Sequence, residues 1–447
     1  MTTQAFVPWF RAAAPYIHAF RGKTFVIAFG GEVVADGRFV TLTHDFNLLA
    51  SLGVRLVLVH GARPQIEARL QAAGIVSHYA AGRRITDRAS LENVKQAVGQ
   101  LRCDIEALLS LGLHDSPMAG ADMQVVGGNF VTAKPLGIRD GVDFCYTGEV
   151  RKVATAALQA QLLAGHVVLL STLGYSPTGE IFNLTVEDVA TMSAMSLGAD
   201  KLIFLQDCAG VVNAQGRLQR EMTAQAAESA LQWPQSDDTR CYLPCCVMAC
   251  RHGVARAHLI SRNVDGALLQ ELFTHHGVGT MITQDPLEHV RPAMIDDVGG
   301  ILRLIEPLEA EGILVKRSRE RLEQEIDRFV VLVHDQRVIG CVAMYAYAEA
   351  DMAELACLAI EQGQRAGKRG DRLLEAVEMR ARQQGIGRLF VLTTHTAHWF
   401  VERGFVPASV TVLPEQKQAF YNYQRKSQVF LKNIVNQESG QKIVTEP

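Results

Sequence analysis

Residues 352–385 read MAELACLAIEQGQRAGKRGDRLLEAVEMRARQQG, and this stretch decides the fold of the C-terminal part of the chain. It opens with an apolar run typical of a buried strand and closes with the apolar spacing of an amphipathic helix. The turn between them is rich in glycine and arginine. Such a turn presents several backbone N–H groups at the start of a helix, where they bind an anion well. The alternative is that the glycines only allow a tight turn and that no anion binds there.

Glu354 stands inside the apolar strand of this stretch. A carboxylate in such a strand is costly unless it is paired or has a chemical task. A carboxylate can remove a proton from an ammonium group directly or through water, so Glu354 is a candidate general base, and a structural ion pair is the alternative. Cys357 follows three residues later without a recognisable histidine partner. We therefore expect this cysteine to make a contact and not to form an acyl intermediate.

The sequence around this stretch predicts an α+β domain over residues 290–433, with a largely antiparallel sheet. Apolar periodicity predicts the elements of this domain, and the tail at 434–447 is predicted to be disordered. The expected helices are 295–311, 318–328, 370–384 and 396–403, and the expected strands are FVVLVH, VIGCVAMYAY, MAELACLAI and RLFVLTT.

The N-terminal part follows a different pattern, in which short β-branched runs alternate with helical stretches rich in alanine and leucine. This alternation predicts a three-layer αβα domain with a parallel-rich sheet over residues 23–284, preceded by an arm helix at 1–22. Pro286 and Pro292 bracket a polar stretch, which predicts the domain boundary. The β-branched runs are TFVIAF, RLVLVHG, HVVLLST, KLIFLQD and ARAHLIS.

Composition and charge exclude several classes of function. Lys and Arg number 44 against 47 Asp and Glu, a net charge of −3, which gives no bulk attraction to nucleic acid or to an anionic membrane. No apolar run is long enough to span a bilayer. The nine cysteines follow no disulfide framework, and the cluster at 241–250 lacks the spacing of a metal site. We expect a cytoplasmic protein with reduced thiols and no metal.

Two segments resemble the GNAT acetyltransferase superfamily. The turn RAGKRG places Arg365 and Gly370 at the ends of that family's pyrophosphate loop, and AHWFVERGF is similar to its later segment near the acceptor. Lys368 stands where the family has glycine, and we expect it to keep a negative φ. The resemblance implies acetyl-CoA as co-substrate, without a permanently bound cofactor. The implied coenzyme contacts are Leu358, Ala359, Ile360, Arg365, Ala366, Gly367, Lys368, Arg369 and Gly370.

GILVKRSRE, ELACLAI, HWFVERGF and LPEQKQAFYNYQRKSQVF resemble the bacterial amino-acid acetyltransferases that make N-acetylglutamate. The resemblance implies acetyl transfer to the α-amine of L-glutamate, the first step of arginine biosynthesis, with Glu354 as base. Two carboxylates on the acceptor call for several cations, although each cation alone could be a solvated surface charge. Phe400 replaces a frequent tyrosine acid, which leaves Tyr421, Tyr423 or water for that role. The implied acceptor contacts are Leu314, Arg317, Cys357, Thr394, Lys417 and Arg425.

AFGGEV, VLVHGARPQI, NLTVEDVA and GADKLIFLQDCAGV resemble the amino-acid kinase family, which implies the fold but not the activity. Ala28 and Cys245 replace two lysines of the kinases, and Arg63 interrupts a glycine triplet, so groups that stabilise phosphoryl transfer are missing. The resemblance implies regulation by L-arginine and a homo-oligomer, a hexamer in that family. The implied effector contacts are Tyr16, Phe20, Glu271, Gly277 and Gly279.

Several alternatives stay open at the level of sequence. Glu271 could be an exposed helix carboxylate, and the aromatic arm could pack only on its own domain or join subunits. The acetyltransferase domain could act on another amine, with the kinase-like domain as its sensor. A non-catalytic sensor of amino acids and acetyl-CoA is a further alternative, which the departures at Lys368 and Phe400 would suit.

Overall fold

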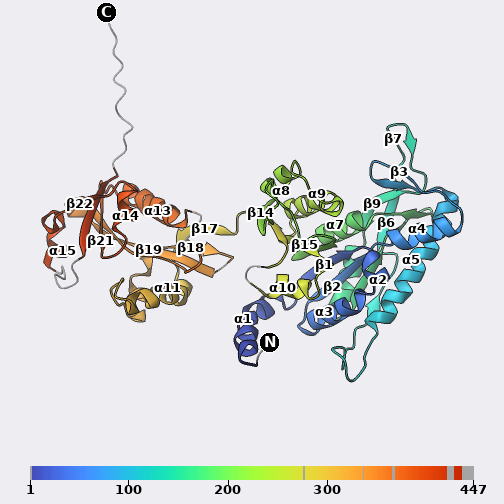
Figure 1. Ribbon diagram of the computed structural model, residues 1–447, viewed down its shortest axis with the longest axis horizontal. Helices are drawn as coiled ribbons and strands as arrows, with labels where there is room; N and C mark the ends of the chain where they lie inside the picture. The colour runs from blue at the N-terminus through green and yellow to red at the C-terminus, as the bar shows by residue number, and fades with distance from the viewer. Residues whose placement is uncertain (1–2, 275–276, 336, 365–367, 420–426, 435–447) are drawn as a thin grey trace, which may run out of the picture. The chain divides into compact units, whose positions relative to one another are not determined.

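The computed structural model describes residues 3–274, 277–335, 337–364, 368–419 and 427–434. It divides into two compact units, Met1–Pro286 and Leu287–Pro447, and each is described by itself below. Figure 1 labels the helices and strands along the chain. Within the described residues, no helix has both the length and the apolar character needed to cross a membrane. The tail was predicted to be disordered over 434–447, but Ile434 is buried in the core of the second unit, and 435–447 lie outside the described residues.

The first unit is built on an eight-stranded sheet in the order β14, β16, β15, β13, β1, β2, β10, β5. Neighbouring strands are parallel except for β15 and β16. The central strands are apolar and buried on both faces, because helices cover both sides of the sheet. The strands are β1 (Thr24–Phe29), β2 (Arg55–His60), β5 (Val125–Val126), β10 (Val167–Ser171), β13 (Lys201–Gln206), β14 (Glu221–Thr223), β15 (Arg256–Ser261) and β16 (Thr280–Thr283).

A smaller sheet and two hairpins extend this unit. The smaller sheet has the order β12, β11, β6, β9, and the hairpins pair β3 with β4 and β7 with β8. The hairpin strands are β3 (His78–Ala80), β4 (Arg83–Ile85), β7 (Ile138–Arg139) and β8 (Val142–Asp143). The strands of the smaller sheet are β6 (Val131–Pro135), β9 (Gly148–Val153), β11 (Leu173–Tyr175) and β12 (Ile181–Asn183).

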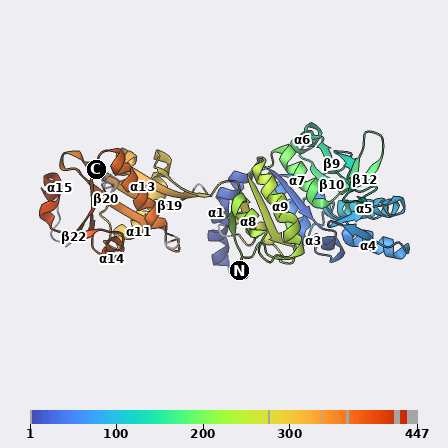
Figure 2. The same cartoon turned by 90° about the horizontal axis from the view of Figure 1, so that it is seen from above.

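Helices pack against the two faces of the large sheet in separate apolar clusters, which makes three layers. Figure 1 shows α7 and α9 on one side of β1 and β15, with α3 and α10 on the other, and Figure 2 shows α8 and α9 in front of the sheet. One layer contains α6 (Thr155–Leu163), α7 (Val186–Leu197), α8 (Ala224–Ala230) and α9 (Asp237–Arg251). The other contains α1 (Thr3–Phe20), α2 (Glu32–Ala35), α3 (Phe39–Ser51), α4 (Arg63–Ala72), α5 (Arg88–Leu109) and α10 (Ala267–Phe273).

The second unit has a seven-stranded sheet in the order β17, β18, β19, β20, β21, β23, β22. All neighbours are antiparallel except β20 and β21, which run parallel. The polar stretch in which the domain boundary was predicted contains β17, the edge strand of this sheet. The strands are β17 (Glu288–Pro292), β18 (Phe329–His334), β19 (Arg337–Tyr347), β20 (Met352–Ile360), β21 (Arg388–Thr393), β22 (Val406–Ala408) and β23 (Gln428–Asn433).

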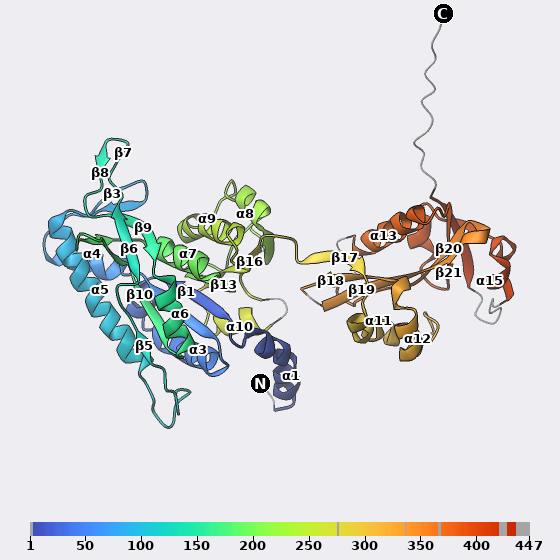
Figure 3. The same cartoon turned by 180° about the vertical axis from the view of Figure 1, so that it is seen from behind.

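Helices α11 (Val298–Ala310) and α12 (Arg319–Gln324) cover one face of this sheet, and α13 (Arg369–Gln383) and α14 (Ala397–Val401) cover the other. Figure 3 shows α13 and α11 on opposite sides of β18 and β19. The helix predicted at 318–328 ends at Gln324, and a 3₁₀ turn (Ile326–Arg328) follows. Glu325, the C-cap residue of α12, accepts a hydrogen bond from Tyr345. The remaining elements are α15 (Glu415–Ala419) and the 3₁₀ turns Ile295–Asp297, Ala348–Ala350 and Val410–Val412.

Candidate active site and effector site

A β-bulge in β20 shapes the centre of the second unit. The pairing of β19 with β20 shifts between Cys341 and Ala343, and Cys357 has a left-handed backbone with a φ of 51°. Leu355, before the bulge, packs in the cluster with α13, whereas Cys357 packs in the cluster with α11. The alternation of faces therefore changes at the bulge. As a result, Glu354 and Cys357 lie on the same face although they are three residues apart.

Glu354 is nearly buried on this face, with a side chain that is 9% exposed. It stands opposite Tyr345 of β19, so the two side chains share one side of the sheet. Lys417 of α15 donates from Nζ to Glu354 Oε2 over 2.6 Å. The hydroxyl of Tyr345 donates to Glu325 Oε2 over 2.7 Å, and burial together with this bond raises the pKa of Tyr345 to about 12. The structure thus pairs the predicted base with a predicted acceptor contact.

Arg317 is the second cation near this face. Its buried Nε has no hydrogen-bond partner within the described part of the chain, and its Nη1 donates to the carbonyl of Val315 over 3.2 Å. Burial opposes the charge of the guanidinium, but Cys357, Tyr345 and Glu354 around it raise its pKa. Burial raises the pKa of the Cys357 thiol to about 11. The thiol is therefore protonated at neutral pH, which argues against a nucleophilic role.

Of the other implied acceptor contacts, the structure describes only some. Leu314 packs, partly buried, against the α11 cluster. Thr394 directly follows β21, and its buried Oγ1 has no hydrogen-bond partner among the residues that the structure describes. Arg425 lies outside the described residues, as do the two tyrosines considered for the acid, Tyr421 and Tyr423. A polar ligand on this face would find unpartnered atoms on both Arg317 and Thr394.

Strand β20 has an open edge beyond Leu355. β21 pairs with β20 only from Met352 to Leu355, and it continues to Thr393 in pairing with β23. The two parallel strands therefore separate, and the backbone at 358–360 has no partner strand on that side within the described residues. An extended, amide-rich ligand could add to this edge as a strand does. This is the stretch that the sequence assigned to the coenzyme.

The N-terminus of α13 supplies the predicted anion site. Lys368 is the N-cap residue, and its φ is 58°, so the expectation of a negative φ is wrong. The residue must turn the chain into the helix, and its carbonyl accepts the N–H of Arg372 over 3.1 Å, which holds a conformation that costs about 1–2 kcal/mol. Arg369 donates from Nε to Glu288 Oε2 over 2.8 Å, so its side chain is already paired. Arg365, Ala366 and Gly367 lie outside the described residues.

Trp399 of α14 fixes the start of α13, a contact that sequence reasoning missed. A Cβ on Gly370 would lie 2.8 Å from Trp399 Cζ2, so only glycine lets the first turn approach the ring this closely. Arg403 stacks on the same ring at 4.0 Å from its centroid and forms an ion pair with Asp371. Phe400 is buried in the core of the unit. The sequence offered one sign of this contact: Trp399 lies in HWFVERGF, the segment that ends with the Gly404–Phe405 pair.

In the first unit, Glu271 of α10 is buried, so the alternative of an exposed helix carboxylate is wrong. Its Oε1 accepts from His258 Nδ1 over 2.8 Å, and its Oε2 accepts the N–H groups of Val278 and Gly279 over 2.7 and 2.8 Å. Although burial opposes its charge, these bonds hold the pKa of Glu271 at about 2. Burial and the charge of Lys201 lower the pKa of His258 to about 4, so this histidine is neutral at neutral pH.

Helix α1 packs beside this carboxylate. Phe20 meets Phe273 of α10 edge to face at 5.5 Å, and Tyr16 lies 6.1 Å from Phe20 between ring centroids. Gly277 has a φ of 54°, and a Cβ on it would lie 2.4 Å from Glu271 Oε2. The structure therefore gathers around α10 the five residues that the sequence assigned to the effector.

The loop after β1 carries a carboxylate over one of its glycines. Glu32 Oε2 would lie 2.0 Å from a Cβ on Gly30, so this acidic side chain covers the glycine. Ala28 of β1 has no charge to offer an anion. A carboxylate over the loop repels phosphate instead of stabilising it. This arrangement agrees with the loss of kinase chemistry inferred from the sequence.

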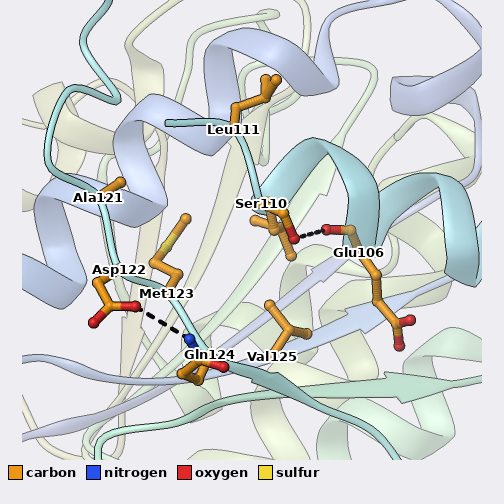
Figure 4. A pocket seen from close by; sticks show the side chains of 9 residues that line it. Glu106, Ser110, Leu111, Ala121, Asp122, Met123, Gln124 and Val125 are labelled. Atoms are coloured by element: carbon orange, nitrogen blue, oxygen red, sulfur yellow. Dashed lines mark hydrogen bonds between the residues drawn. The ribbon is translucent and has the colours of Figure 1, made fainter. Parts of the chain in front are cut away.

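A polar pocket of about 340 Å³ at the end of α5 contains none of these candidates (Figure 4). Its polar groups are paired within the protein: Ser110 Oγ donates to the carbonyl of Glu106 over 2.7 Å, and Gln124 Nε2 donates to Asp122 Oδ1 over 3.1 Å. No group of three or more His, Cys, Asp or Glu side chains in the described ranges could hold a metal ion.

The sequence patterns of two families match the chain. The Amino acid kinase family matches residues 23–261, and the Acetyltransferase (GNAT) family matches residues 301–405. Together with the two sheets, these matches define the class of protein: a two-domain acetyltransferase in which a kinase-like α/β domain precedes an α+β GNAT domain. They confirm the fold class predicted from the sequence.

Relatives resemble the whole chain. The amino-acid acetyltransferases of Pseudomonas fluorescens strain Pf-5 and Ralstonia nicotianae are 53% and 51% identical to it, over 96% of this chain and 99% and 96% of theirs. The crystal structure of N-acetylglutamate synthase from Neisseria gonorrhoeae complexed with coenzyme A and L-arginine is 40% identical, with a TM-score of 0.88 over 96% of this chain and 100% of that one. A structure of the Neisseria enzyme with coenzyme A and N-acetyl-glutamate gives a TM-score of 0.62. The chain belongs to the bacterial amino-acid acetyltransferase family, the N-acetylglutamate synthases, and it is an enzyme.

Proposed function

We propose that this enzyme transfers the acetyl group of acetyl-CoA to the α-amine of L-glutamate, with Glu354 as the general base. The observation that carries the proposal is a nearly buried carboxylate near two cations: the Glu354 side chain is 9% exposed, Lys417 pairs with it, and Arg317 lies close enough to interact. An acceptor with two carboxylates fits such cations. The 40% identical Neisseria enzyme, whose structure contains coenzyme A and N-acetyl-glutamate, supports the same substrates here.

The transfer is direct. Glu354 takes a proton from the glutamate ammonium group, either directly or through one water, and the free amine attacks the carbonyl carbon of the thioester. The N–C bond forms and the C–S bond breaks. Coenzyme A leaves as a thiolate, and it takes up the second proton that the nitrogen loses when it becomes an amide. Cys357 keeps its own proton at neutral pH and contacts the acceptor.

Acetyl-CoA binds as a co-substrate along the open edge of β20. Its amide-rich arm pairs with the backbone at 358–360, as an added strand would. Its pyrophosphate meets the backbone N–H groups at the start of α13, near Arg369 and Gly370, where the helix dipole favours an anion. This arrangement brings the thioester to the strand that carries Glu354.

The test of the base is Glu354→Gln. We expect turnover of glutamate to fall by about 10²–10⁴-fold, with the largest loss at low pH, where more of the amine is protonated. Coenzyme A binding, measured by calorimetry, should not change. Glu378→Gln is the matched control, because Glu378 is 11% exposed and pairs with Lys432 over 2.6 Å on the α13 side of the sheet. Equal turnover of Glu354→Gln and the wild type across pH would remove Glu354 as the base.

The kinase-like domain binds L-arginine as a regulator at α10. Glu271 has a carboxylate that can pair with a guanidinium group, and Phe20 of α1, with Tyr16 beside it, packs on Phe273 of the same helix α10. The Neisseria enzyme, whose structure contains L-arginine, supports this effector. Binding there would displace at least one of the hydrogen bonds that Glu271 now accepts, which links the effector to the packing of α10 and β15.

The enzyme is a homo-oligomer that assembles through α1. Phe6, Trp9 and Phe10 are 48%, 41% and 52% exposed and lie against one another on one side of the helix. An aromatic surface of this kind favours contact with another subunit. All nine cysteines are free, which favours action in the reducing cytoplasm.

A further inference from the structure

The ion pair between Lys417 and Glu354 occupies the proposed base. Lys417 Nζ lies 2.6 Å from Glu354 Oε2, and the Glu354 side chain is only 9% exposed. A base accepts a proton through an oxygen lone pair, and Oε2 already accepts a charge-assisted hydrogen bond. The acceptor also arrives as an ammonium ion, which the nearby lysine ammonium repels. While Lys417 holds this position, one oxygen of Glu354 is occupied and an incoming ammonium group meets a like charge beside the base.

The two cations of this face are held differently. Arg317 is partly buried, and its buried Nε has no partner in the described residues, so this N–H can bind an acceptor carboxylate without giving up another bond. Lys417 stands on α15, a helix of five residues, and its side chain is 24% exposed. Its charge is carried on a flexible four-carbon stem. Lys417 is therefore the cation that can exchange one carboxylate for another.

We propose that Lys417 determines acceptor specificity by locking Glu354 until a second carboxylate of the acceptor draws the lysine away. The inference rests on the proposed function and adds a switch to the same site. A dicarboxylate replaces Glu354 as the partner of Lys417, and the released Glu354 oxygen then faces the α-ammonium. An acceptor with a neutral side chain has no charge with which to make this exchange. Selection thus operates on turnover as well as on binding.

Glutamine is the sharpest probe, because it has the shape of glutamate and lacks only the side-chain charge. We expect the wild type to acetylate glutamine with a kcat far below that for glutamate. In Lys417→Met the lock is absent, so the kcat for glutamine should rise by about tenfold or more. The same variant should lose about 10–100-fold in kcat/KM for glutamate, because a charged partner of the acceptor is gone.

Lys432→Met is the matched control, because Lys432 makes an ion pair of the same length with Glu378 on the other side of the sheet. It should keep the wild-type kcat for both amino acids. Lys417→Gln serves as a second variant, and the melting temperature of each variant checks its folding.

The proposed lock is refuted if both Lys417 variants acetylate glutamine with a kcat no higher than that of the wild type. If Glu354→Gln is inactive in that case, the base assignment survives and only the lock fails. If Glu354→Gln turns over glutamate normally, the proposed function fails first.

Discussion

Replacing Glu271 with glutamine preserves the shape of a buried side chain but leaves no orientation that satisfies its neighbours. Lys201 has only donor hydrogens and faces His258 Nε2, so the imidazole proton lies on Nδ1 and points at Glu271. The N–H groups of Val278 and Gly279 point at the other carboxylate oxygen. Whichever way the amide is turned, its NH₂ group meets a donor.

The size of the effect follows from these contacts. A buried donor without an acceptor costs about 1–3 kcal/mol, and a hydrogen bond to a charged group is worth about 1.5–3 kcal/mol. The pKa of Glu271, about 2 against an ordinary 4.5, corresponds to about 3 kcal/mol of stability. Because the pKa is lowered in the folded state, this stability is present above pH 4.5 and is lost as the pH falls toward about 2.

We therefore expect Glu271→Gln to lose about 3 kcal/mol of local stability at neutral pH, which is about two orders of magnitude in the opening equilibrium. Hydrogen exchange of the full chain, followed by mass spectrometry, should show this increase in the amides of β15 and α10. The rate of glutamate acetylation should also stop responding to L-arginine. Glu228→Gln is the control, because Glu228 is 54% exposed and pairs with Arg251 at the surface. Exchange equal to that of the control, with an intact arginine response, would refute the reasoning.

Two further predictions concern the coenzyme loop and the oligomer. Gly370→Ala places a Cβ 2.8 Å from Trp399, and the overpacking of about 1–3 kcal/mol should weaken coenzyme A binding about tenfold or more in calorimetry. Gly299→Ala, whose Cβ meets nothing within 4 Å, should bind as the wild type does. Phe10→Ser should shift the protein to a smaller species in light scattering, because an exposed aromatic contact is lost. Val76→Ser, at a residue 71% exposed elsewhere on the same domain, should not change the mass, and an unchanged mass in Phe10→Ser would exclude α1 as the contact.

Local patterns allowed much of the fold to be predicted. Periodicity depends only on neighbouring residues, so β18, β20 and α13 were predicted within one residue of their observed bounds. Short or polar elements such as β17, β22 and α15 carry too little periodicity to be recognised. Glu354 was conspicuous because a charge inside an apolar strand needs a reason. The backbone of Lys368 was predicted wrongly, because the turn before α13 takes a left-handed conformation there, which a lysine disfavours and local sequence does not reveal.

The sequence by itself determined the two domains, the position of Glu354 in an apolar strand and the glycine-rich turn before α13. Only the tertiary structure decided which of these groups meet. Strict alternation along β20 would place Glu354 and Cys357 on opposite faces, and the bulge brings them to one. Lys417, 63 residues from Glu354 along the chain, reaches it because the fold returns to the same face of the sheet. Periodicity is a local property, whereas strand register and long-range pairing depend on the whole packed domain.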